Sequence, residues 1–198
     1  MTEERHRQLQ AEAVAADGVA HRALMAGDEA GASRAFARAS ATYAASWDLA
    51  PPASFGRLVG WMKAAILSGD PALADAAAPA VLQAIDGDEG AAGSPAAAWA
   101  EALAASWSQA DERLPEAIAT MRQGPPPFER AAAAVQAIAD GDADALPAAL
   151  DAIIEDFAAR EDHLTGVAIA DTAMVLAVIA QRRGLPGPTG SPVPAGGT

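Results

Sequence analysis

Alanine is the sequence feature that most constrains this fold. Of the 198 residues, 57 are alanine and only 45 are larger apolar residues. Alanine is the best helix former, whereas the strand-favouring residues Val, Ile, Tyr, Phe and Trp together number 26. Alanine-rich helices can also approach each other closely, so a modest number of large side chains can still close a core. The sequence therefore predicts an all-α protein, and its length suits a single domain.

The charge of the chain limits its partners. The formal net charge is -13 with an isoelectric point near 4.4, which repels phosphate backbones and anionic lipid. We therefore expect neither nucleic acid nor a membrane surface as a partner. The basic residues are twelve arginines and one lysine, Lys63, a bias that with the alanine content suggests a GC-rich bacterial gene. The absence of cysteine excludes disulfides and thiolate metal sites. The charged N-terminus, and the lack of any apolar stretch of about 18 residues, predict a cytoplasmic protein.

Glycine, proline and aspartate divide the chain into helix-sized intervals. Side chains that can cap a helix precede several of them, namely Asp28, Ser54, Asp70 and Ser94. The last segment, 185–198, is rich in proline and glycine, so we expect a flexible tail after a single domain of residues 1–184. The predicted helices are 3–26, 28–47, 55–68, 71–86, 95–108, 112–123, 128–139, 145–160 and 166–183.

Internal similarity indicates repeated helical hairpins. In segments 23–39, 65–81 and 137–153 one helix ends at Gly-Asp and a second begins. Small or apolar residues five, nine and twelve positions after each glycine lie on one face of the second helix. A weaker fourth copy is centred on Gln109-Ala110, and the four turns are separated by 42, 40 and 32 residues.

The first copy, with Gly27-Asp28 followed by Ala32, Phe36 and Ala39, resembles the tetratricopeptide repeat, a helix-turn-helix unit of about 34 residues. The resemblance covers residues 15–160. It implies a tetratricopeptide-like array of four helical hairpins, here followed by a C-terminal apolar helix.

In that family the first helix of each pair lines a concave, protein-binding face. The resemblance therefore implies a partner-binding surface, and on it we expect a protein or peptide to contact Lys63, Trp99 and Trp107. The residues that the family pattern places along the face are His21, Met25, Lys63, Leu67, Trp99, Leu103, Trp107 and Val135. For the two tryptophans, the alternative is ordinary core packing.

The segment DGDADALPAALD, residues 140–151, imitates a calcium loop because acidic residues occupy its first, third, fifth and twelfth places. Such a loop needs glycine at the sixth place, where this chain has Ala145, and the eighth place is Pro147. We therefore predict a helix-to-helix turn capped by Asp142 or Asp144 instead of a metal site. The acidic segment 140–162 is either a solvated face or a surface for a basic peptide.

No catalytic signature is evident. His6, His21 and His163 share no ligand spacing, and no phosphate-binding glycine loop is present, so we predict no metal, no cofactor and no enzyme activity. The preferred function is a non-catalytic module that binds a protein or peptide in a concave groove. The alternative is a small-molecule-binding or catalytic helical protein with a pocket near His163 or His21.

Two readings concern the end of the helical region. The cluster EDHLTG at 161–166, with Asp171 and Thr172, can be read as an acid/base site, but we favour a loop in which Thr165 caps the last helix. That helix, 166–183, is apolar around most of its circumference. Since such a helix is usually buried on both sides, we expect the N-terminal helix or a second subunit to cover it, and we predict a homodimer.

Overall fold

The computed structural model describes residues 2–194, and this part of the chain contains nine α-helices, two short 3-10 helices and no strand. The predicted all-α class is confirmed. The helices are α1 (Thr2–Met25), α2 (Glu29–Trp47), α3 (Gly56–Leu67), α4 (Pro71–Asp86), α5 (Pro95–Ser108), α6 (Leu114–Met121), α7 (Pro126–Asp140), α8 (Ala145–Ala158) and α9 (Asp171–Arg182). None of them is long and apolar enough to cross a membrane.

Three of the four expected caps begin their helices. The side chains of Asp28, Asp70 and Ser94 accept hydrogen bonds from backbone N–H groups two or three residues later. Ser54 is different, because α3 begins at Gly56 and only the backbone oxygen of Ser54 accepts a bond, from the Arg57 N–H. Local capping chemistry therefore explains most of the helix starts.

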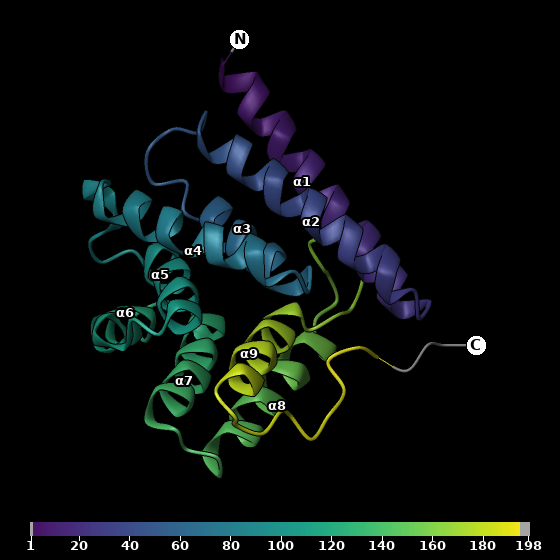
Figure 1. The fold of residues 1–198 in the computed structure, drawn as a ribbon, viewed down its shortest axis with the longest axis vertical. Helices are drawn as coiled ribbons and strands as arrows, with labels where there is room; N and C mark the ends of the chain where they lie inside the picture. Colours follow the sequence, from purple (N-terminus) through teal and green to yellow (C-terminus); the bar gives the residue numbers. More distant parts are fainter. Residues whose placement is uncertain (1, 195–198) are drawn as a thin grey trace.

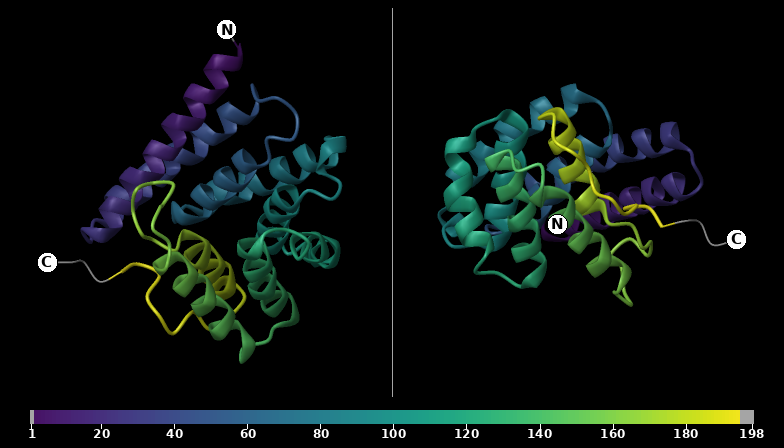
Figure 2. Two further views of the ribbon diagram at one scale, coloured as in Figure 1. Left: turned by 180° about the vertical axis from the view of Figure 1, so that it is seen from behind. Right: turned by 90° about the horizontal axis from the view of Figure 1, so that it is seen from below.

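Each helix from α1 to α8 packs against the next one along the chain, and the succession of helices forms an arc (Figure 1). Helix α9 lies on the inner side of this arc, against α3, α7 and α8. The segment 159–170, between α8 and α9, extends back to the first hairpin, as both Figure 1 and the left view of Figure 2 show. The C-terminal part of the chain thus closes against its N-terminal part.

The apolar faces of α9 are covered by the same chain. Val175, Leu176 and Ile179 are fully buried, and beyond the helix Arg183 donates to the Ser106 oxygen of α5 and pairs with Asp111. The cover comes mainly from α3, α7 and α8, whereas the N-terminal helix α1, the expected alternative, packs principally against α2. The apolar character of α9 therefore requires no second subunit, and the observation that suggested a homodimer is accounted for within one chain.

The expected flexible tail makes specific contacts as far as it is described. Asp151 of α8 accepts hydrogen bonds from Thr189 and Gly190, and the Pro192 oxygen accepts one from the Ala170 N–H. Residues 185–194 therefore lie against α8 and the segment before α9. Backbone hydrogen bonds hold them there, and amino-acid composition does not predict such bonds. The remaining tail residues, 195–198, fall outside the described part.

Two buried clusters form the interior. The larger one runs from α3 to α9 and contains many fully buried large side chains, among them Leu58, Met62, Leu103 and Leu114. The smaller one joins α1, α2 and α3. Its buried members are seven alanines together with Phe36 and Tyr43.

Candidate functional site

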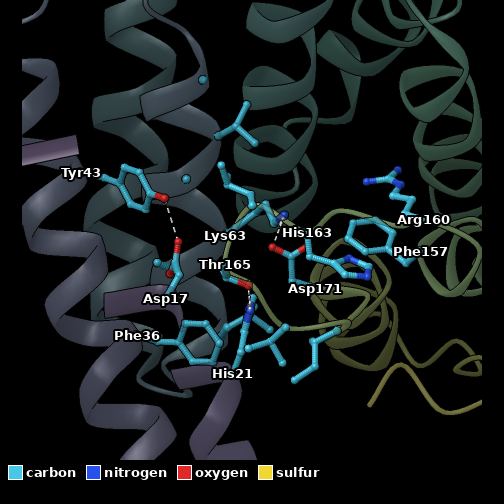
Figure 3. A pocket seen from close by; sticks show the side chains of 18 residues that line it. Asp17, His21, Phe36, Tyr43, Lys63, Phe157, Arg160, His163, Thr165 and Asp171 are labelled. Carbon is cyan, nitrogen blue, oxygen red and sulfur yellow. Dashed lines mark hydrogen bonds and ion pairs between the residues drawn. The ribbon is translucent and has the colours of Figure 1, made fainter. Parts of the chain in front are cut away.

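A cavity of about 230 Å³ lies where segment 159–170 meets the first three helices. Side chains from α1, α2, α3, the end of α8 and the start of α9 surround it (Figure 3). Its polar side chains are Asp17, His21, Tyr43, Lys63, Arg160, His163, Thr165 and Asp171, and its aromatic ones include Phe36 and Phe157. The tertiary structure thus brings His21 and His163, the two alternative pocket residues of the sequence analysis, to one cavity.

An ion pair links α3 to α9 at this cavity. The Lys63 Nζ lies 2.5 Å from Asp171 Oδ2, and it also donates to Thr172 Oγ1 over 3.3 Å. The two side chains are only 16% and 21% exposed. Burial raises the pKa of the Asp171 carboxyl, but the Lys63 ammonium outweighs that effect and holds this pKa below its usual range. The only lysine of the chain is therefore already neutralised by a carboxylate of the same pocket.

A second carboxylate, Asp17 of α1, has a different environment. The Tyr43 hydroxyl donates to Asp17 Oδ2 over 2.8 Å. Burial raises the pKa of Asp17 to about 6, although the bond from Tyr43 and the charge of Lys63 both act to lower it. Burial likewise raises the pKa of Tyr43, so the phenol remains a donor at neutral pH.

Gly60 makes room for the Tyr43 ring. A Cβ atom built at Gly60 would lie 2.6 Å from the Tyr43 Cζ atom, a distance that a real Cβ contact does not reach. The missing side chain therefore allows the ring to lie directly against α3 and to point its hydroxyl at Asp17.

His21 ties α1 to segment 159–170. Its Nδ1 lies 2.9 Å from Thr165 Oγ1, a contact between residues 144 positions apart, and its ring meets Phe36 edge-on at 5.7 Å. Burial lowers the pKa of His21, so the imidazole is neutral at pH 7. Gly18 lets the segment approach, because a Cβ there would be 3.2 Å from the Thr165 carbonyl oxygen. Thr165 was expected to cap α9, but α9 begins six residues later, and its hydroxyl contacts His21 instead.

A second, smaller cleft of about 130 Å³ adjoins the cavity, and the side chains of Phe157 and Arg160 lie between the two. The His163 ring stacks on Phe157 at 6.5 Å, and the Arg160 guanidinium lies 4.1 Å from the centre of the same ring. Asp156 holds Arg160 in place and also pairs with Arg130. Phe157 and Arg160 line both hollows, and Trp99 lines the second one.

The three residues expected to contact a partner are placed differently. Lys63 lines the polar cavity and Trp99 the neighbouring cleft, where the tryptophan is 6% exposed. Trp107 is 5% exposed, donates its indole N–H to Asp75 over 2.8 Å, and is covered by the Arg182 guanidinium at 4.3 Å. Lys63 and Trp99 are therefore neighbours across one wall, whereas Trp107 is packed between α4 and α9.

Asp17 and Tyr43 were not identified from the sequence as site residues. Asp17 does carry a signal, because it is an acidic residue on the same helical face as the buried Ala13 and Ala20. A carboxylate on the packed face of an alanine-rich helix needs a polar partner or a cavity. Tyr43, the only tyrosine, carries no such signal in its neighbourhood.

The calcium-like segment forms a turn in the structure. Asp142 Oδ1 accepts from the N–H groups of Asp144 and Ala145, at the start of α8. Asp151, at the twelfth place, instead binds Thr189 and Gly190 of the C-terminal segment. No cluster of three or more His, Cys, Asp or Glu side chains suited to a metal is found in the described part of the chain.

Comparison with known proteins gives no match to a family model, to a curated protein or to a solved structure.

Proposed function

We propose that this protein binds a small polar molecule in the cavity between the first three helices and segment 159–170. The observation that carries the proposal is the convergence of Asp17, His21, Lys63 and Asp171 on one hollow. Burying such groups is unfavourable unless each is paired or serves a ligand, and perturbed ionisable groups collected in a cleft are typical of functional sites. Here two of these side chains, Asp17 and His21, have pKa values displaced mainly by burial.

The size of the cavity limits the ligand. The cavity volume of about 230 Å³ is below the range of about 300–1,000 Å³ for pockets that hold drug-sized compounds. A metabolite with a few heavy atoms fits this volume. A folded domain or a helix does not.

Obstructing the mouth of the cavity tests the proposal. Gly56 lines the cavity and is exposed, and a Cβ there meets no atom within 4 Å, so Gly56→Leu places a large side chain at the mouth of the cavity without a clash at Cβ. A small-metabolite screen by thermal shift should find compounds that raise the melting temperature of the wild type but not of Gly56→Leu.

Gly187→Leu is the matched control, because a Cβ at Gly187 also meets nothing within 4 Å and this residue does not line the cavity. It should respond to the same compounds as the wild type. If every stabilising compound acts equally on wild type and Gly56→Leu, the cavity is not the binding site.

The tetratricopeptide-like arrangement and binding of a peptide remain a second candidate. It is favoured by one observation, that the Lys63 cavity and the Trp99 cleft adjoin at Phe157 and Arg160 and so offer two neighbouring subsites. Helix α9 occupies much of the inner side of the arc, which confines a peptide to these two hollows. A partner that co-purifies with the wild type and with Trp107→Phe, but not with Trp99→Ala, would favour this candidate.

A further inference from the structure

We propose that the ligand of this cavity is a small organic cation, a protonated amine, whose ammonium group binds the Asp17 carboxylate. The inference rests on the proposed function, that the cavity binds a small molecule, and it specifies the chemical class of that molecule.

The two carboxylates of the cavity differ in what balances their charge. Asp171 has the Lys63 ammonium at 2.5 Å and forms the α3–α9 link. Asp17 accepts a hydrogen bond from the Tyr43 hydroxyl, but among the described residues no cationic atom lies within 4.0 Å of it. Asp17 is therefore a largely buried carboxylate with a neutral donor and no counter-ion.

The groups that face Asp17 leave its charge uncompensated. His21, from the same helix, is neutral at pH 7, and Tyr43, from α2, is protonated. Lys63, from α3, and Asp171, at the start of α9, cancel each other as a pair. His163 lies on segment 159–170, with its ring stacked on Phe157.

Arg160 also lines the cavity, but its guanidinium is held by Asp156. Asp156 also pairs with Arg130, so it does not fully neutralise Arg160. Asp17 is nevertheless the one carboxylate lining the cavity, among the described residues, that has no cationic atom within 4.0 Å.

A cationic ligand would balance the charge of the Asp17 carboxylate. An ammonium group beside Asp17 supplies the missing counter-ion, and buried charges are stable when they are paired. Phe36 and Tyr43 add aromatic rings near the same place, which attract cations over their faces. A carboxylate ligand would meet two like charges, and it would have to displace Asp171 to reach Lys63.

Three probes with similar four-carbon skeletons test the inference: n-butylamine, n-butanol and butyrate. Their binding is followed by the amide NMR shifts of Gly60, Ala64 and Thr165, which line the cavity. We expect saturable shifts with n-butylamine, at least tenfold weaker responses with the alcohol and the acid, and loss of at least tenfold in n-butylamine affinity in Asp17→Asn. Asn keeps a side-chain oxygen that can accept the Tyr43 hydrogen bond, so we expect the variant to fold.

Asp48→Asn is the control for general charge. Asp48 is an exposed residue at the end of α2 and does not line the cavity, so this variant loses the same unit of charge elsewhere. Its n-butylamine affinity should equal that of the wild type. Equal losses in Asp17→Asn and Asp48→Asn would overturn the inference, because the amine would then respond only to the net charge of -13.

The pH dependence gives an independent readout. The amine needs ionised Asp17, whose pKa is raised to about 6, so n-butylamine affinity should fall about tenfold between pH 7 and pH 5. Over the same range the n-butylamine affinity of Asp17→Asn should not change.

The failure of this inference is separable from failure of the proposed function. If n-butanol or butyrate shifts the cavity amides and Asp17→Asn binds it as well as the wild type does, the amine specificity is refuted while a ligand site remains. If none of the three probes shifts these amides, the amine inference is overturned. The Gly56→Leu screen then decides separately whether the cavity binds any small molecule.

Discussion

The two buried clusters of this protein are built from different side chains, and among the described residues only the smaller cluster contributes buried members to the lining of the cavity. In the cluster from α3 to α9, large side chains such as Leu103 and Leu176 fill the space between helices. In the cluster of α1, α2 and α3, alanines bring the helices together, and Phe36 and Tyr43 are the only large side chains among its buried members in the described part of the chain. Alanine lets these three helices pack tightly, but its short side chain does not fill the space towards segment 159–170. The junction with segment 159–170 is therefore left to polar side chains and an open volume.

The comparison implies two kinds of stabilisation. Burial of apolar area holds the large cluster together, whereas individual polar contacts, such as His21–Thr165 and Lys63–Asp171, hold the junction. Variants in the large cluster should therefore change global stability most, and variants at the junction should act locally.

The largest effect is expected for Leu103→Ala in α5. Leu103 is 0% exposed, so the variant leaves a cavity in the large cluster and should lower the free energy of unfolding by roughly 3 to 5 kcal/mol. Urea unfolding measures this change. Leu164→Ala is the control, because Leu164 is 83% exposed and its loss should change stability by less than about 0.5 kcal/mol. Similar losses in both variants would contradict the importance of the large cluster.

Asp17→Asn should stabilise the protein at neutral pH by up to about 3 kcal/mol, which is the free-energy equivalent of raising the Asp17 pKa from 3.8 to about 6. The folded-state pKa of Asp17, about 6, lies above its ordinary value of 3.8, so protonation favours the folded state. In the wild type this contribution is fully present below about pH 3.8 and is lost as pH rises through about 6. Asparagine does not titrate, so the advantage of the variant should grow between those two values and stay constant above them.

Urea unfolding at a series of pH values checks this expectation. Asp48→Asn, at an exposed position, is again the matched control and should show no such growth. A constant difference between Asp17→Asn and wild type from pH 4 to pH 8 would show that Asp17 does not titrate unusually.

Gly60→Ala should lower the stability of the protein and Gly56→Ala should not, although both residues lie in α3. Alanine is the better helix former at each position, but at Gly60 its Cβ would lie 2.6 Å from the Tyr43 ring, whereas at Gly56 it meets nothing within 4 Å. We expect Gly60→Ala to lose about 1 to 2 kcal/mol and to displace Tyr43 from Asp17. Gly56→Ala should be neutral or slightly stabilising. Thermal unfolding of both variants measures the change in stability, and NMR of the Tyr43 ring shows whether the ring has moved.

The smallest effect is expected for Thr165→Val, which removes the hydroxyl that contacts His21. A single hydrogen bond of this kind contributes about 1 kcal/mol, and its loss should act mainly on segment 159–170. Hydrogen exchange should quicken in that segment while the centre of α5 remains protected. Thr42→Val removes an exposed hydroxyl bonded within α2 and should leave segment 159–170 unchanged. Uniformly faster exchange would mean that the junction and the large cluster unfold together.

The individual site residues were visible in the sequence to different degrees. His21, His163, Lys63 and Asp171 each stood out as candidate polar residues, but no local spacing joined them. They lie on α1, segment 159–170, α3 and α9, and only the return of that segment places them together. Asp17 was missed because its significance depends on Tyr43, which lies 26 residues further along the chain.

The sequence by itself determined the all-α class and most helix boundaries, because these depend on groups within one turn of each other. The caps at Asp28, Asp70 and Ser94 act on backbone N–H groups two or three residues away, and alanine favours a helix wherever breakers are absent. Only the tertiary structure decided that α9 lies inside the arc, that α9 begins at Asp171, and that Thr165 meets His21 across 144 residues. Such contacts depend on how all eight preceding helices pack against one another, and a short stretch of sequence does not determine that packing.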